Sequence, residues 1–419
     1  MTKNHHFRSK ERKFTIIIPT RDRADTLAHT LNTATKQDYA NLEIIVSDNA
    51  SHDNTSDIVK SINDPRVHYI NTGRRVSMSH NWEFALSHVD EGWVTVLGDD
   101  DAILPGALKT VNQIIDSTGT QAIRSNGCGY AWPTLTNTKY GTMDLSVRRG
   151  YKRVRSANAL CQVMSGTLRY INLPVLYNGG FIDFSLVKKA KSITGSFFLS
   201  MTPDTYSGIV FSFLTEEYIY SHEPLAINGA SHHSGGTAAF SGLKTKRSYD
   251  PAEKFFSEEN IPFHPSLPLT KNGTPVKSIQ AIVYEAYLQA AAFHSIKPMV
   301  NDLVSPQQQL DIILKDLLLY PHTIEEVMQW APQFAKQNDF VFNGLRKPNF
   351  NAIILSRYLM KIPDFLTTAI VTGKENLELN NVYEASIVAE SIKKTFFRKF
   401  SILLPSWIVR LSKFLKRLT

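Results

Sequence analysis

The sequence predicts an α/β fold, in which helices flank a mostly parallel sheet, followed by a helical C-terminal region. Short β-branched runs alternate with helix-like stretches through roughly the first hundred residues. This alternation is typical of parallel sheets, because a helix is the usual crossover between neighbouring parallel strands. From residue 279 onward, apolar side chains recur at three-to-four spacing, which indicates helices.

The expected elements follow one another closely along the chain. A β-branched run at 14–19 precedes a helical pattern carried by Leu27, Leu31 and Ala34. The later strands are expected at 42–46, 67–70 and 93–97, and the helices at 55–62, 79–88, 279–294, 307–319 and 324–336. Ligands of such sheets bind at the carboxyl ends of the strands.

The composition indicates a globular chain whose excess charge lies in one segment. Of the 419 residues, 42% are hydrophobic, enough for a sizeable core, and the net charge is +8. The segment 391–419 holds eight Lys or Arg residues and no acid, so acidic and basic residues balance in the rest of the chain. A neutral body disfavours nucleic-acid binding.

Neither a secreted scaffold nor an integral membrane protein is expected. The chain has two cysteines, Cys128 and Cys161, too few for a disulfide framework or a cysteine zinc site. Its basic start leads into only a short apolar run at 14–19, unlike a signal peptide. No apolar run approaches the length of a membrane-spanning helix. We therefore expect a cytoplasmic location.

The basic segment 391–419 also has the pattern of amphipathic helices. One helical face would carry Phe396 and Phe400, and a second, beyond Pro405, would carry Trp407. Aromatic residues on one face and only cations on the other are typical of helices that lie on anionic membranes. The alternatives are a helix docked on its own core and a coiled-coil partner, but the absence of acid favours the membrane.

Polar clusters stand at the ends of three expected strands. They are Pro19-Thr-Arg-Asp-Arg23, Ser47-Asp-Asn-Ala-Ser-His-Asp53 and the acidic triplet Asp99-Asp-Asp101. Because parallel strands of one sheet end at the same edge, these clusters should meet there. Adjacent carboxylates repel one another without a cation, and hard oxygen ligands suit Mg²⁺ or Mn²⁺. The pattern predicts a nucleotide-diphosphate site with a divalent metal.

A simpler interpretation of the acidic triplet is a solvated turn, or an N-cap for a helix near Pro105. The other two clusters favour the nucleotide site. No GxGxxG motif follows the first strand and no GxxxxGK[ST] motif occurs, so an NAD-dependent dehydrogenase and a P-loop enzyme are disfavoured.

The three motifs together resemble those of a family-2 glycosyltransferase with the GT-A (Rossmann-like) fold, of the bacterial surface-polysaccharide type. The resemblance covers roughly 13–115 well and weakens toward about 236. It implies inverting transfer of a sugar from a nucleotide-diphosphate donor, with a divalent metal on the diphosphate. Together with the proline content, the apolar periodicity and the charge pattern, it divides the chain into a GT-A domain at 1–240, a Pro-rich linker at 241–278, a helical accessory region at 279–390 and the membrane-associating tail at 391–419. Within the first domain, about 13–120 would bind the nucleotide and about 121–240 the acceptor.

The resemblance assigns donor-site roles to specific residues. Asp48 matches the carboxylate that binds the base, although Asn49 and Ala50 replace the second Asp and the Gly of the family's Val-Asp-Asp-Gly-Ser motif. Asp53 matches a residue that more often braces the turn. The other residues implied at the donor site are Pro19, Thr20, Arg21, Arg23, Arg75, Asn81 and Asp99, with Arg74 beside them.

The same resemblance implies the metal ligands. The triplet can be aligned in two registers, one of which places Gly98 at the first Asp of Asp-x-Asp-Asp. Both registers make Asp100 the direct ligand of Mn²⁺ or Mg²⁺, with Asp101 beside it. Some members recruit a histidine from a late loop, which makes His232 a provisional ligand. A surface turn with His232 and His233 satisfied is the alternative.

Inverting transfer also needs a base for the acceptor hydroxyl. Asp204, after Pro203 and before an expected helix, is the candidate, although a helix N-cap is the alternative. Weaker candidates are Glu216, Glu217 and Asp183.

We therefore expect a metal-dependent enzyme, peripheral on the cytoplasmic face of the inner membrane, that transfers a hexose or N-acetylhexosamine to a glycan or lipid-linked acceptor. A UDP-sugar is the favoured donor because UDP is the commonest donor nucleotide in such enzymes. The alternatives are a catalytically degenerate scaffold of a polysaccharide assembly, suggested by Gly98 and Asn49, and a sugar nucleotidyltransferase.

Overall fold

The computed structural model describes residues 11–136, 138–234, 258–317, 321–342, 344, 368–374, 377 and 379–400, with only the backbone of 396–400. Its main sheet has eight strands in the order β3-β2-β1-β4-β10-β6-β11-β9. The strands in chain order are β1 (Phe14–Thr20), β2 (Leu42–Asp48), β3 (Val67–Asn71), β4 (Trp93–Val96), β6 (Ala122–Ser125), β9 (Tyr151–Arg155), β10 (Gly180–Asp183) and β11 (Glu217–Ser221).

The first four strands are parallel, as predicted, because helical crossovers join them. β1 pairs in parallel with both β2 and β4, and β2 with β3. β10 is antiparallel to β4 and β6, whereas β11 runs parallel to β6. The crossover helices are α1 (Ala24–Thr35), α2 (Thr55–Ser61) and α3 (Met78–Leu86). The predicted α/β fold is confirmed.

A second sheet of five strands lies against α1, in the order β13-β8-β7-β12-β5. Its strands are β5 (Ala102–Ile103), β7 (Cys128–Ala131), β8 (Thr142–Ser146), β12 (Ala226–Ala230) and β13 (Thr368–Thr372). β12 pairs with β5 through Ile227 and Ala102, so it runs directly behind the acidic triplet.

The central strand is buried on both faces, since side chains alternate along it. Phe14, Ile16 and Ile18 enter a core under α1 and α4 (Ala107–Thr118). Ile17 enters a second core on the opposite face. That second core is covered by α3, α6 (Ser156–Met164), α7 (Phe184–Thr194) and α8 (Pro203–Leu214).

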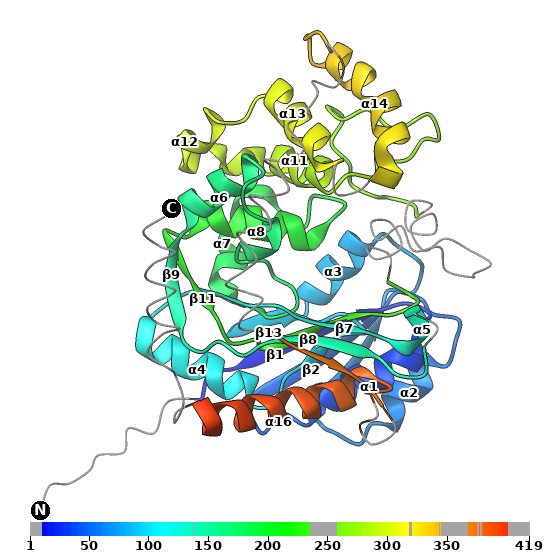
Figure 1. The fold of residues 1–419 in the computed structure, drawn as a ribbon, viewed down its shortest axis with the longest axis vertical. Helices are drawn as coiled ribbons and strands as arrows, with labels where there is room; N and C mark the ends of the chain where they lie inside the picture. Colours follow the sequence, from blue (N-terminus) through cyan, green and yellow to red (C-terminus); the bar gives the residue numbers. More distant parts are fainter. Residues whose placement is uncertain are drawn as a thin grey trace, which may run out of the picture.

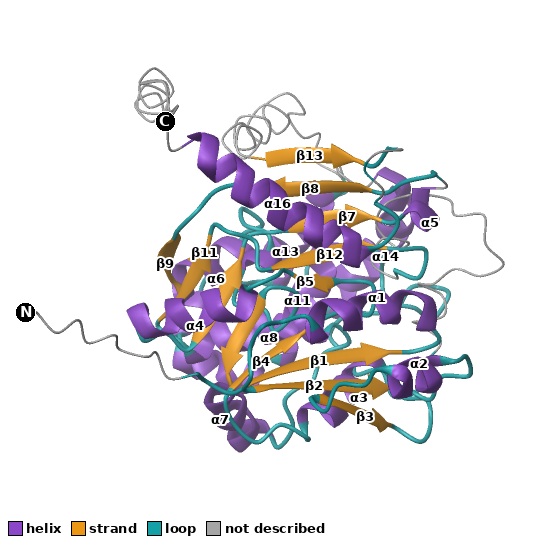
Figure 2. Cartoon of the chain, turned by 90° about the horizontal axis from the view of Figure 1, so that it is seen from below, coloured by secondary structure: helices purple, strands orange, loops and turns teal. Residues whose placement is uncertain are grey.

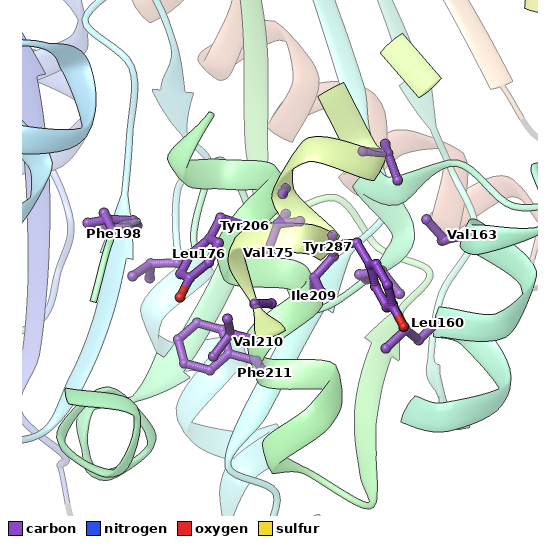
Figure 3. Packing of buried hydrophobic residues seen from close by; sticks show 14 of the residues in the cluster. Leu160, Val163, Val175, Leu176, Phe198, Tyr206, Ile209, Val210, Phe211 and Tyr287 are labelled. Carbon is purple, nitrogen blue, oxygen red and sulfur yellow. The ribbon is translucent and has the colours of Figure 1, made fainter. Parts of the chain in front are cut away.

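The helical region continues this second core rather than forming its own. Its helices stack above α6, α7 and α8 (Figure 1). Tyr287 packs near Leu160, Val163 and Ile209 (Figure 3), and Phe334 belongs to the same cluster. The helices are α11 (Ile279–Gln289), α12 (Pro298–Asn301), α13 (Pro306–Asp316) and α14 (Ile324–Gln337), with short 3₁₀ turns between them.

After the helical region, the chain returns to the first domain, so the domain boundaries differ from the expected ones. β13 extends the second sheet beside β8, although 279–390 was expected to be a helical accessory region. The last helix, α16 (Val382–Phe400), crosses that sheet (Figure 2) and buries Val382, Ala385 and Ala389 against it. The strand β13 was not predicted, because its partner β8 lies more than two hundred residues away in the sequence.

α16 also overlaps the start of the expected tail. It crosses the predicted boundary at 390/391, and Lys393 is 7% exposed in an ion pair with Glu223 (2.7 Å). Lys393 therefore packs on the domain, whereas Lys394 is exposed. The rest of the predicted membrane segment, 401–419, lies outside the described residues. Among the helices of the described part, none has the length and apolar character to cross a bilayer.

Candidate active site

The carboxyl ends of β1, β2 and β4 meet at one edge of the main sheet, as predicted. The amide of Asn49 donates to the carbonyl of Thr20 (2.9 Å), and that of Leu97 donates to the carbonyl of Ile17 (2.8 Å). Pro19 and Thr20 end the central strand between the other two clusters. Backbone pairing therefore brings the three polar clusters together.

Arg23 joins the first cluster to the acidic triplet. Its guanidinium donates to Asp99 Oδ1 (2.8 Å) and to the backbone carbonyl of His233 (2.8 Å). Burial raises the pKa of Asp99, the charge of Arg23 opposes this shift, and Asp100 adds to it. Burial alone would lower the pKa of Arg23, but Asp99 and Asp100 raise it overall. An anionic ligand at this edge would compete with Asp99 for the guanidinium.

Asp100 is held by the loop 231–234, which follows β12. Its Oδ2 accepts hydrogen bonds from the hydroxyls of Ser231 (2.6 Å) and Ser234 (2.6 Å). Within the described part of the chain, the hydrogen bonds of this side chain all use Oδ2 and leave Oδ1 available. Carboxylate and hydroxyl oxygens are hard ligands of the kind that Mg²⁺ and Mn²⁺ prefer. The residues at Asp100 therefore fit the predicted metal.

Asp101 does not fit the role of a metal ligand. Its Oδ2 accepts from the backbone amide of Gly98 (2.9 Å) and its Oδ1 from that of Gly229 (2.7 Å). The side chain is fully buried, and burial together with the charge of Asp100 raises its pKa to about 8. Asp101 ties the triplet to β12, and its carboxylate is used within the protein.

Gly98, one departure from the family motif, has a steric reason. A Cβ at this position would stand 2.6 Å from Asp101 Oδ2 and 2.8 Å from the hydroxyl of Tyr177. Because these two groups occupy the space, no side chain fits there without displacing them. The register that aligns Gly98 with a first aspartate therefore has no room for that aspartate.

Asp48 is oriented by the neighbouring strand. Its Oδ2 accepts from the hydroxyl of Tyr69 (2.6 Å) and from Asn71 Nδ2 (3.0 Å), and its Oδ1 accepts from the amide of Ser51 (2.9 Å). The side chain is 1% exposed. These contacts fix the carboxylate at the end of β2, the position expected for a base-binding residue.

The other two departures lie in the loop after Asp48. The side-chain amide of Asn49 donates to the carbonyl of Val76 (2.8 Å) and accepts from its amide (2.9 Å), a pairing that a carboxylate cannot make. Ala50 has a φ of +52°, a conformation that glycine adopts more easily. Asp53 accepts from the amide of Ala24 (2.9 Å), so it braces the turn.

Two predicted donor-site arginines form ion pairs. Arg21 pairs with Glu258, and Arg75 pairs with Asp22 (2.6 Å). Arg74 is exposed beside them. Among the described residues, the ion pair with the acidic triplet comes from Arg23 and from none of these three arginines.

Asn81 has a structural position. It is 4% exposed, and its amide exchanges hydrogen bonds with Ser47, whose hydroxyl donates to Asn81 Oδ1 (2.7 Å). This pairing joins α3 to β2. Asn81 therefore supports the second polar cluster through its hydrogen bonds to Ser47.

The late-loop histidines contact the start of α1. His233 Nε2 lies 3.1 Å from Asp25 Oδ1, and the rings of His232 and His233 are 3.7 Å apart. The three side chains could share a cation, since their ligand atoms lie within 4.8 Å of one another. Because Ser231 and Ser234 bind Asp100, the same loop also brings His232 toward the acidic triplet.

Asp204 lies in the first turn of α8 and is partly exposed. Its Oδ2 accepts from the hydroxyl of Tyr170 (3.1 Å). Burial raises the pKa of Asp204, and hydrogen bonds from the amide of Thr205 and from Tyr170 oppose that shift. A carboxylate with a raised pKa, held by a phenol, can accept a proton near neutral pH.

Two residues lie between Asp204 and the triplet, and neither was predicted: the partly buried Tyr177 and the buried Arg124. Tyr177 hydrogen-bonds Asp101; burial raises the pKa of Tyr177, and the charges of Asp101, Asp100 and Asp204 add to that shift. Arg124, on β6, donates to the carbonyl of Tyr177 (2.9 Å) and also feels the charge of Asp204. The only signal in the sequence was that Tyr177 precedes a Gly-Gly pair.

The weaker candidates for the base have structural positions. Asp183 caps α7 through the amide of Ser185 (2.9 Å). Glu217 pairs with Arg153 on the edge strand β9. Glu216 follows α8; burial lowers the pKa of Lys297, and the charge of Glu216 opposes that shift.

Comparison with known proteins agrees with this geometry. The family model "Glycosyl transferase family 2" matches residues 15–179. A stretch of 104 residues is 36% identical to GalNAc(5)-diNAcBac-PP-undecaprenol beta-1,3-glucosyltransferase of Campylobacter jejuni, covering 24% of this chain and 34% of that protein. Another of 112 residues is 28% identical to the succinoglycan biosynthesis protein ExoO of Rhizobium meliloti, covering 27% and 32%. The chain thus spans about a third of the length of these curated relatives.

Among solved structures, residues 1–349 of TarS from S. aureus in complex with UDP-GlcNAc cover 91% of this chain and 92% of that one, at 15% identity and a TM-score of 0.48. The matched stretch 15–179 contains all three polar clusters of the strand-end edge.

Proposed function

We propose that this protein is an inverting, metal-dependent glycosyltransferase. It transfers a sugar from a nucleotide-diphosphate donor, with UDP favoured, to a hydroxyl of a glycan or lipid-linked acceptor in bacterial surface-polysaccharide synthesis. The observation that carries the proposal is the geometry of the strand-end edge, where Arg23 binds Asp99 and the loop 231–234 binds Asp100. The placement of the candidate base Asp204 beside the acidic triplet is part of the proposal, and it is supported by Tyr177, which hydrogen-bonds Asp101 and feels the charge of Asp204.

In the proposed donor site, Asp100 holds Mn²⁺ or Mg²⁺ with help from the hydroxyls of Ser231 and Ser234. The metal, when bound, would neutralise charge on the diphosphate and so favour its departure. Arg23, which binds Asp99 in this structure, would contact the phosphates. Asp48 and the end of β1 would bind the nucleoside.

In the proposed acceptor site, Asp204 is the base. Its carboxylate takes the proton of the acceptor hydroxyl while that oxygen attacks the anomeric carbon. The bond from the anomeric carbon to the diphosphate oxygen breaks on the opposite face, which inverts the configuration. Tyr170 orients the carboxylate through its hydrogen bond. General-base help of this kind contributes about 10²–10⁴-fold to a rate.

The proposed acceptor class is supported by the similarity to two relatives. One is a glucosyltransferase for an undecaprenol-linked glycan, and the other is a succinoglycan biosynthesis protein. A lipid-linked acceptor agrees with a location on the cytoplasmic face of the inner membrane, with the basic segment 391–419 on anionic lipid. A degenerate scaffold is disfavoured, because Gly98 and Asn49 both have structural roles.

The first experiment is calorimetric binding of UDP, GDP, dTDP and CMP, with and without Mn²⁺. We expect one nucleotide to bind in a metal-dependent manner, and Asp100→Ala to abolish the metal dependence. Asp101→Asn is the matched comparison: it should lower thermal stability more than it changes the metal response. A folded wild-type protein that binds none of these nucleotides would overturn the proposal.

A further inference from the structure

A buried glutamate of the helical region contacts the loop that precedes Asp204. Glu285, on α11, is fully buried. Its Oε2 accepts from the hydroxyl of Ser200 (2.5 Å), and its Oε1 accepts from the amide of His264 (3.0 Å) and from Gln289 Nε2 (2.9 Å). One side chain therefore joins α11, the stretch before it and the loop 196–202.

Ser200 is the point where these contacts reach the acceptor half. Its carbonyl accepts from the hydroxyl of Ser79 on α3 (2.6 Å), and the amide of Thr202 donates to its hydroxyl (3.3 Å). Thr202 is the N-cap residue of α8, and Asp204 lies in the first turn of that helix. Only three residues along the backbone thus separate Ser200 from the candidate base.

The first turn of α8 is held by the hydroxyl of Tyr170, which donates to Asp204 Oδ2 (3.1 Å). The N-cap Thr202 makes no side-chain capping hydrogen bond, so the Ser200–Glu285 contact supports the segment just before that turn. A carboxyl group buried in an apolar core is unfavourable unless its oxygens are hydrogen-bonded, so each of these contacts is costly to lose. Here the three donors belong to three separate segments, and one of those segments leads into α8.

We propose that Glu285 is a positioning residue, which fixes the start of α8 and thereby the carboxylate of Asp204 relative to the acceptor hydroxyl. This inference rests on the proposed role of Asp204 as the base. It gives the helical region a task in the reaction: α11 completes the acceptor side of the site without touching the substrate.

The test compares full-length variants with a matched control. Glu285→Ala removes the contact, and Glu285→Gln keeps its shape, because the Ser200 hydroxyl can accept from the amide. The control is Glu326→Ala on α14, where Glu326 likewise accepts from a backbone amide, that of Lys277 (2.6 Å), but does not contact the loop 196–202. The readouts are kcat and KM for the UDP-sugar that the wild type turns over, the Kd of UDP with Mn²⁺, and hydrogen exchange of amides 197–206.

We expect Glu285→Ala to lower kcat about 10- to 100-fold, since small misplacement of a reacting group has effects of this size. The KM and the Kd should stay within about twofold, and exchange should rise in 197–206 but not in 15–60. Glu285→Gln should retain kcat within about threefold, and Glu326→Ala within about twofold. If Glu285→Ala does not fold, Ser200→Ala replaces it, with a smaller loss of kcat expected.

A loss of kcat no greater than in Glu326→Ala, or an equal loss of UDP binding, would overturn the proposal. Failure of the proposed function gives a different result. In that case neither the wild type nor Asp204→Asn releases UDP, and unchanged hydrogen exchange at 197–206 in Glu285→Ala would still contradict the positioning role.

Discussion

The donor half and the acceptor half of the site are held in different ways. In the donor half, Asp48 is the last residue of the paired strand β2 and Asp99 lies three residues beyond the paired strand β4, so backbone hydrogen bonds place them. In the acceptor half, Asp204 is held by side chains from distant segments, through Tyr170 and the Ser200–Glu285 contact. Local sequence builds the first half, whereas long-range packing builds the second.

The sharpest test of this division is Asp204→Asn. The substitution keeps the shape and the hydrogen bond from Tyr170 but removes the base. We expect sugar transfer to fall about 10³-fold, while UDP binding in the presence of Mn²⁺ changes less than twofold. Steady-state kinetics and calorimetry of one protein preparation measure both. Equal losses of binding and transfer would show that the two halves are not separable.

Gly98→Asp tests the rigidity of the donor half. It restores the aspartate of the family motif, but the new side chain meets Asp101 and Tyr177. Overpacking should reduce the free energy of unfolding by about 1–3 kcal/mol and weaken metal-dependent UDP binding. Gly127→Ala is the control, because a Cβ there has nothing within 4 Å. A stable Gly98→Asp protein with unchanged binding would contradict the steric argument.

The pH dependence of stability tests the acceptor half. Burial raises the pKa of Glu285 from an ordinary 4.5 to about 7. Between these values the folded protein keeps a proton that the unfolded chain has released, so the free energy of unfolding falls as the pH rises, by up to about 3 kcal/mol. Urea unfolding at pH 5 and 7.5 should show this fall in the wild type and a weaker one in Glu285→Gln. Parallel profiles would argue against a raised pKa.

The smallest expected effect concerns the turn after Asp48. Because Ala50 has a positive φ, Ala50→Gly should stabilise the protein by about 0.5–1 kcal/mol without changing UDP binding. Ala157→Gly, within α6, should instead destabilise it by about 1 kcal/mol. Thermal melting of both variants measures the difference, and destabilisation by Ala50→Gly would count against strain in this turn.

The same division explains what could be predicted from the sequence. The strands at 14–19 and 42–46 and the polar residues that follow them were found because each signal is contiguous. The spacing of the triplet does not say which carboxylate turns inward, so Asp101 was assigned to the metal although it binds two backbone amides. Arg124 and Glu285 gave no signal, since their partners are far away in the sequence.

The contact of β13 and α16 with the second sheet has a consequence during synthesis. Tyr130 and Met143 are buried in the cluster that Leu379 and Val382 complete, and β8 pairs with β13 along its outer edge. When only the first 240 residues have left the ribosome, the nascent chain therefore exposes an apolar surface and an unpaired strand. The second sheet can be completed only after the whole helical region has emerged. Until then, the nascent chain must keep the edge of β8 from pairing with other chains.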